Sequence, residues 1–177
     1  MPYRKKSMAE LQRLSPKAFK EVAKLPVCLI LDDIRSANNV GSVFRTADSF
    51  ALQHIYLCGI TAVPPHRDIL KTALGATESV SWSYHDNCAA LITQLKADNF
   101  EVQALEQTHD SVKLRNYLPP TDHPLAVVLG NEVNGVQQTV IDHCHGTIEL
   151  EQFGTKHSLN VAVATGMVVY TLSCQLR

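Results

Sequence analysis

The chain has 177 residues, of which 45% are hydrophobic and 19% are charged. This length and composition fit one globular domain with a sizeable core and exclude an extended disordered chain. Because no apolar run approaches the roughly 20 residues that span a bilayer, we do not expect this chain to span a membrane as a helix. The charged first residues precede no apolar segment, so we expect no secretory signal. Five cysteines without a CxxC spacing are expected to be reduced thiols in the cytoplasm.

Charge is unevenly distributed along the chain. Residues 1–24 hold seven basic and two acidic side chains, a net charge of +5, whereas the remainder holds nine basic and fifteen acidic side chains, a net charge of −6. A basic arm on an acidic body favours an anionic partner such as RNA, although a solvated helix face would have the same composition. We therefore expect a basic helical extension over residues 1–25 and one domain over residues 26–177.

Helices and strands are expected to alternate along the chain. Ser15 followed by Pro16 is typical of a helix start. Apolar runs predict strands at 27–31, 54–58, 80–84, 100–105, 125–129 and 147–150. Helical spacing predicts helices at 39–50, with Asn39 or a neighbour as its cap, and at 68–74, 91–95, 137–143 and 158–172, while 106–123 is expected to be mostly loop. This alternation predicts an α/β fold with a mostly parallel sheet and helices on both faces.

Polar segments at 38–45, 130–135 and 153–160 each adjoin an apolar strand or helix. The last of them leads into the final helix, whose first turn offers unpaired N–H donors to a polar ligand. Ser158 or Asn160 could simply cap that helix, and 130–135 could be only a tight turn. Because sites in parallel sheets lie at the carboxyl ends of strands, we expect these segments to converge on one site, together with Asp32-Asp33 and Glu106.

Several common site motifs are missing. The sequence contains no GxGxxG dinucleotide fingerprint, no GKS or GKT phosphate loop and no GxSxG nucleophile elbow. His143-Cys144-His145 alternates in a way that places neighbours on opposite faces of a strand, and no second ligand cluster accompanies it. We therefore expect no metal site.

Together the polar segments resemble the three motifs of the SpoU, or TrmH-like, branch of the SPOUT class of S-adenosylmethionine-dependent RNA methyltransferases. The resembling stretches are 39–47, 128–135 and 148–164. The resemblance implies a parallel α/β fold with a C-terminal trefoil knot, a homodimer, and methyl transfer to a ribose 2′-hydroxyl of tRNA or rRNA rather than DNA. Glu151 departs from the family pattern, which usually has proline there, and Val133 stands where glycine is common.

The resemblance also implies roles for individual residues. Those implied to hold S-adenosylmethionine are Leu105, Leu129, Gly130, Asn131, Glu132, Leu150, Gln152, Gly154, Ser158 and Leu159. Those implied to act in catalysis are Arg45, Asn39, Glu132, Ser158 and Asn160.

In the family the arginine of the first motif is assigned as the base. A guanidinium holds its proton too tightly to be a ready base, so we expect Arg45 to bind the adjacent phosphate and stabilise the developing alkoxide. Glu132 is expected to fix Arg45 by an ion pair, and the purely structural alternative is a salt bridge from Arg45 to Asp48 or Glu132.

Two other functions remain open on the sequence. A catalytically silent member of the same fold would bind RNA or the cofactor without transfer. A nucleotide-binding oxidoreductase would also have an α/β fold, but the missing glycine fingerprint disfavours it.

Overall fold

The computed structural model describes residues 3–7 and 9–177. Within that part of the chain, seven strands form one sheet in the order β3-β2-β1-β6-β4-β7-β5, and the paired strands run parallel. The strands are β1 (Leu25–Asp32), β2 (Leu52–Cys58), β3 (Trp82–His85), β4 (Glu101–Leu105), β5 (Val112–Lys113), β6 (Leu125–Leu129) and β7 (Gly146–Glu149). The helices are α1 (Pro16–Glu21), α2 (Ala37–Ser49), α3 (Arg67–Ala73), α4 (Ala76–Ser79), α5 (Cys88–Ala97), α6 (Gln138–Ile141) and α7 (Val161–Leu176), with a 3-10 helix η1 (Leu114–Asn116).

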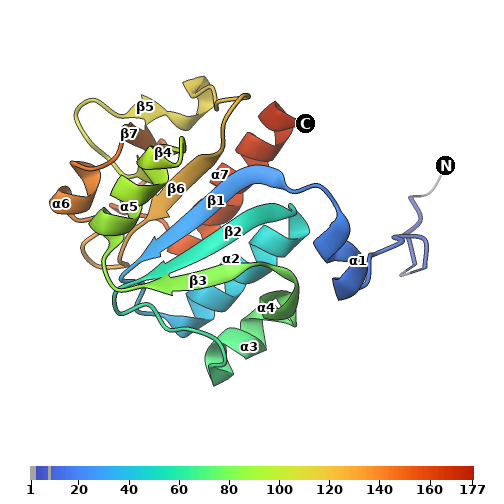
Figure 1. Ribbon diagram of the computed structural model, residues 1–177. Coiled ribbons are helices and arrows are strands. Elements are labelled where there is room, and N and C mark those ends of the chain that lie inside the picture. Colours follow the sequence, from blue (N-terminus) through green and yellow to red (C-terminus); the bar gives the residue numbers. More distant parts are fainter. Residues whose placement is uncertain (1–2, 8) are drawn as a thin grey trace.

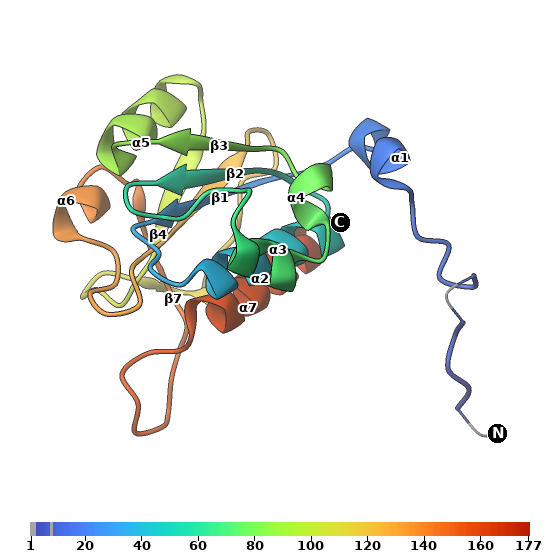
Figure 2. The same cartoon turned by 90° about the horizontal axis from the view of Figure 1, so that it is seen from below.

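Helices cover both faces of the sheet, which confirms the predicted fold class. Helices α2, α3, α4 and α7 lie on one face, and α5 and α6 lie on the other (Figures 1 and 2). Strand β6, in the middle of the sheet, is buried along its whole length. Its alternate residues enter two different cores: Val127 packs with the α2 and α7 side, and Val128 packs with the α5 side. Burial of each such side chain contributes roughly 1.5–3 kcal/mol, which is why this run is apolar throughout.

The observed N-caps confirm one of the predicted helix starts and correct two others. The hydroxyl of Ser15 accepts a hydrogen bond from the Ala18 N–H, as Ser15-Pro16 predicted. Asn39, by contrast, is not a cap: Ser36 caps α2, and Asn39 lies inside the helix. Asn160 caps α7 and accepts from the N–H groups of Ala162 and Val163, so this helix begins later than predicted.

The segment predicted as mostly loop contains short regular structure. Strand β5 pairs with β7 at the edge of the sheet, and η1 follows directly. A two-residue strand carries too little periodicity to be predicted from sequence.

Among the described residues no helix is long and apolar enough to cross a membrane. The trefoil knot stays a prediction, as does the boundary between residues 1–25 and 26–177.

Candidate cofactor and substrate site

A cavity of about 630 Å³ lies beyond the carboxyl ends of β4, β6 and β7. Nine of the ten residues predicted to hold the cofactor line it: Leu105, Leu129, Gly130, Asn131, Glu132, Leu150, Gln152, Ser158 and Leu159. Gly154 does not line it and is exposed in the long loop before α7. Asn160, predicted as catalytic, also lies in the wall. The predicted convergence of the second and third polar segments on one place is therefore confirmed, whereas Asp32 and Asp33 lie outside the wall.

A chain of side-chain hydrogen bonds joins all three polar segments at the rim of this cavity. The amide of Asn39 donates to Glu132 Oε1 over 2.9 Å. The amide of Asn160 donates to Asn39 Oδ1 over 3.1 Å. Because Asn160 also caps α7, the first turn of α2, the loop after β6 and the start of α7 are held in one arrangement. This contact explains why a polar residue lies at position 39, inside the helix.

Glu132 is held by backbone donors as well as by Asn39. Its two carboxylate oxygens accept from Arg35 N–H over 2.9 Å and from Ser36 N–H over 3.1 Å. Burial opposes the charge, but the hydrogen bonds from Arg35, Asn39 and Ser36 outweigh it and place the pKa of Glu132 below its ordinary value. The carboxylate is thus satisfied by the start of α2.

The prediction that Glu132 forms an ion pair with Arg45 is wrong. In the part of the chain that the structure describes, the salt bridges involve neither residue. Asp48, the other partner considered for Arg45, accepts a hydrogen bond from the hydroxyl of Ser79 instead. The physical reason is geometric: Glu132 faces the first turn of α2, whereas Arg45 lies in a later turn, on the exposed face of the helix.

Arg45 lines a second cavity, of about 500 Å³, between α2, α3 and α7. Lys71 and Thr72 of α3 and Gly166 of α7 also line it, together with hydroxyl groups from α2. Two cationic side chains and four hydroxyl groups give part of this wall a positive charge that suits a phosphate group, and the apolar Phe50 and Leu74 complete the wall. Arg45 and the first cavity are therefore not brought together within one copy of the chain.

The loop after β6 is both a tight turn and a wall of the first cavity. Asn131 Oδ1 accepts from the N–H groups of Val133 and Asn134, and the Asn131 amide donates to the carbonyl oxygen of Asp33. At Gly130 a Cβ atom would lie 2.2 Å from Val136 N, so a side chain there would push the loop apart. The segment is therefore a tight turn closed on itself by Asn131, as the structural alternative predicted, and the same residues line the first cavity.

Other wall residues were not predicted. Thr108, Val136, Gln138, Ile141 and His157 also line the cavity. The position of Thr108 after β4 and of Val136 after β6 could have indicated them, because loops after neighbouring parallel strands meet. Nothing in the sequence pattern of α6 indicates that Gln138 and Ile141 face a ligand.

A parallel α/β sheet with a half-apolar cavity at the carboxyl ends of its strands, closed by the start of a helix, is the arrangement of a protein that binds a small organic cofactor. Leu129, Leu150 and Leu159 supply apolar surface, and Gln152 and Ser158 supply polar side chains. These features fit a cofactor with an aromatic ring and polar ends, such as S-adenosylmethionine.

Comparison with known proteins identifies the family. The SpoU rRNA Methylase family matches residues 26–170, and the chain belongs to this family. It is 32% identical over 154 residues to a Staphylococcus aureus protein named "Putative TrmH family tRNA/rRNA methyltransferase", covering 87% of this chain and 61% of that protein. It is 29% identical over 151 residues to the 23S rRNA (guanosine-2′-O-)-methyltransferase RlmB of Neisseria meningitidis, covering 85% of this chain and 59% of the relative. The chain thus spans about 60% of the length of these relatives.

Solved structures share the fold. The A. aeolicus TrmH/SpoU tRNA modifying enzyme has a TM-score of 0.78 at 22% identity, covering 90% of this chain and 79% of that chain. The AdoMet-bound rRNA methyltransferase from Sinorhizobium meliloti has a TM-score of 0.79 at 24% identity, covering 94% of this chain and 62% of that chain. The SPOUT methyltransferase fold is therefore shown for this chain.

Proposed function

We propose that this protein is an RNA methyltransferase that transfers a methyl group from S-adenosylmethionine to a ribose 2′-hydroxyl of tRNA or rRNA. The observation that carries the proposal is the hydrogen-bonded chain Glu132–Asn39–Asn160, which joins all three polar segments at the rim of the 630 Å³ cavity. Such a chain fixes the cavity and the first turn of α2 relative to each other. Positioning of this kind is the main contribution a protein can make to methyl transfer.

The cofactor would be held in the first cavity. Its volume lies in the range of small-molecule sites. Leu105, Leu129, Gly130, Asn131, Glu132, Leu150, Gln152, Ser158 and Leu159 would form the contacts, and Gly154 would allow the covering loop to bend. When bound, S-adenosylmethionine supplies an electrophilic methyl group on a positively charged sulfur.

The substrate would lie between the rim of this cavity and the cationic wall. Asn39, Ser158 and Asn160 would orient the ribose, since all three carry short polar side chains at or near the rim. In the transfer, the methyl–sulfur bond breaks, a methyl–oxygen bond forms and the hydroxyl proton leaves to an acceptor. Arg45 would bind the adjacent phosphate and stabilise the charge that develops on the oxygen. RNA is the substrate because only RNA carries the 2′-hydroxyl.

A homodimer would complete the site. Val163, Met167 and Tyr170 follow helical spacing along α7 and are about half exposed or more, at 54%, 49% and 61%. An apolar stripe of this kind favours a protein partner. Helix α7 borders both cavities, the first through Val161 and the second through Gly166. Two copies paired across α7 about a two-fold axis would therefore bring the Arg45 of one copy toward the cofactor cavity of the other.

Two further features support this function. The basic arm over residues 1–24 would attract RNA. The proposed compartment is the cytoplasm, where RNA substrates meet the enzyme and where cysteines such as the buried Cys28, Cys58 and Cys88 stay reduced.

The test is transfer of labelled methyl from S-adenosylmethionine to unmodified tRNA and rRNA transcripts, with DNA of the same sequences as the control. We expect label in RNA and none in DNA. Cofactor binding without transfer to any transcript would instead support the silent member of the fold. Equal labelling of RNA and DNA would exclude the ribose hydroxyl as acceptor.

A further inference from the structure

Glu106 places a fixed carboxylate in the wall of the first cavity. It follows β4 directly and lines the first cavity. Its Oε1 accepts from Gln107 N–H over 2.8 Å, and its Oε2 accepts from Val136 N–H over 2.9 Å. A Cβ atom at Gly135 would lie 2.2 Å from Oε2, so the glycine leaves the room that this carboxylate occupies. The Glu106 side chain is therefore held against the loop after β6.

The charged side chains in the wall of this cavity are acidic. Its described wall contains two carboxylates, Glu106 and Glu132, and contains neither lysine nor arginine. The oxygens of Glu132 already accept three hydrogen bonds from the start of α2. Each oxygen of Glu106 accepts one hydrogen bond and keeps a further lone pair. Glu106 is thus the wall carboxylate with the most capacity left for a ligand.

We infer that Glu106 selects the charge of the cofactor: it favours the positively charged sulfonium of S-adenosylmethionine over the neutral thioether of S-adenosylhomocysteine. This inference rests on the proposed function and adds a specificity residue to it. A fixed negative charge attracts a cation several ångströms away in a partly dry cavity and has little effect on a neutral sulfur. Because transfer removes the positive charge from sulfur, the same carboxylate would hold the substrate cofactor and release its product.

The experiment measures dissociation constants by calorimetry for three ligands: S-adenosylmethionine, S-adenosylhomocysteine and sinefungin, which carries an ammonium group in place of the sulfonium methyl. For Glu106→Gln we expect the preference for the two cationic ligands over S-adenosylhomocysteine to fall about tenfold. Glu106→Asp keeps the charge and should keep most of the preference. Glu149→Gln is the matched control, because Glu149 lies at the end of β7, pairs with Lys113 over 2.7 Å and does not line the cavity.

A second variant leaves the bonds of Glu106 intact. Gln138→Lys places a positive charge in the wall, on the exposed side of α6, and should lower the same preference. It gives a result even where Glu106→Gln fails to fold.

Three outcomes are distinguishable. A lower preference in Glu106→Gln and Gln138→Lys, with the control unchanged, supports the inference. Equal weakening of all three ligands in Glu106→Gln would show that Glu106 only latches the loop, and would overturn it. If the wild-type protein binds none of the ligands, the proposed function fails first and the inference falls with it.

Discussion

Asn39 is the side chain through which segments far apart in the sequence come into contact. It donates to Glu132 and accepts from Asn160, at 2.9 Å and 3.1 Å. The sequence predicted that Asn39, Glu132 and Asn160 share a site, because polar residues after parallel strands meet at one edge. It could not predict that Glu132 binds Asn39 rather than Arg45. That choice depends on where α2 begins, and Ser36 rather than Asn39 caps it.

The carboxylate of Glu132 should stabilise the fold in a pH-dependent way. Its folded-state pKa is lowered, so its contribution is complete above the unfolded-state pKa and is lost as pH falls through the folded-state pKa. We expect Glu132→Gln to lower the free energy of unfolding at about pH 7 by roughly 1–3 kcal/mol, since a backbone donor loses its acceptor. The difference from wild type should shrink by about pH 3.

Urea unfolding at the two pH values measures this effect. Glu78→Gln, an exposed glutamate on α4, is the matched control and should change the free energy of unfolding little. A difference between wild type and Glu132→Gln that stays constant from neutral to acid pH would contradict the role given to the Glu132 charge.

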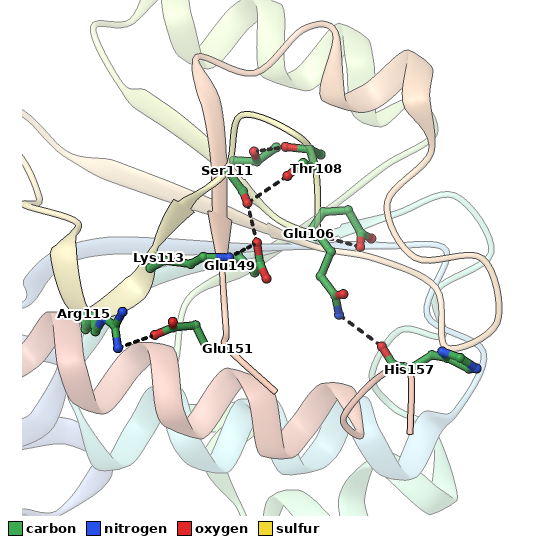
Figure 3. A network of polar contacts seen from close by, with 10 residues as sticks. Glu106, Thr108, Ser111, Lys113, Arg115, Glu149, Glu151 and His157 are labelled. Atoms are coloured by element: carbon green, nitrogen blue, oxygen red, sulfur yellow. Dashed lines mark hydrogen bonds and ion pairs between the residues drawn. The ribbon is translucent and has the colours of Figure 1, made fainter. Parts of the chain in front are cut away.

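At the scale of elements, two contacts hold the loop before α7, whose two ends line the first cavity. Arg115, in η1, pairs with Glu151 over 3.1 Å, and the Gln107 amide donates to the His157 carbonyl over 3.0 Å (Figure 3). Strand β5 and η1 could not be predicted because both are very short and because β5 depends on pairing with β7. The ion pair explains how a glutamate is accommodated where the family usually has proline.

Glu151→Pro tests how much that ion pair contributes. The Arg115 side chain is 67% exposed, and pairs of this kind contribute about 0–1 kcal/mol. We therefore expect the affinity for S-adenosylmethionine to be kept or increased, because proline stiffens the loop. Calorimetric titration checks this, with Arg115→Ala as the partner variant. A loss of affinity of more than about tenfold, or about 1.4 kcal/mol, in both variants would show that the pair is needed for cofactor binding.

The basic arm around α1 should account for part of the RNA affinity. Lys5, Lys6, Lys17 and Lys20 are exposed. Their replacement by glutamine should weaken RNA binding and flatten its dependence on salt, because fewer counterions are released. Filter binding across a salt series measures the slope, and an unchanged unfolding curve shows that the fold is intact. A salt dependence with the same slope as wild type would show that these lysines do not contact RNA phosphates and would contradict this role of the arm.

At the scale of the whole molecule, Arg45 lines a different cavity from the one proposed for the cofactor, and this separation is why we propose that a second copy completes the site. The apolar strands predicted the parallel sheet and the meeting of the polar loops after them, whereas the individual residues of the cavity were implied by the resemblance to the SpoU family. The second cavity, lined by Arg45, Lys71 and Gly166, depends on how α2, α3 and α7 pack against one another. The spacing of apolar residues along the sequence does not determine that packing, so this cavity could not be predicted.

Mixing two inactive variants tests the shared site. Arg45→Ala should bind the cofactor without transfer, and Leu159→Lys, which places a cation in the cavity wall, should not bind it. Random exchange of subunits would give hybrid dimers with one intact site, and about a quarter of wild-type activity. Arg67→Ala, an exposed arginine of α3 outside both cavities, is the control for Arg45→Ala and should stay active. Hybrid dimers without activity would place Arg45 and the cavity of one copy in the same site.

The most direct measurement locates the transferred methyl group. RNA labelled by the wild-type protein is hydrolysed with alkali, which cannot cut beside a 2′-O-methylated ribose, and the products are compared with those from Arg45→Ala. We predict label in alkali-resistant dinucleotides for the wild type, and none for the variant despite unchanged cofactor affinity. Label on bases, or equal labelling by Arg45→Ala, would contradict a ribose methyltransferase that depends on this arginine.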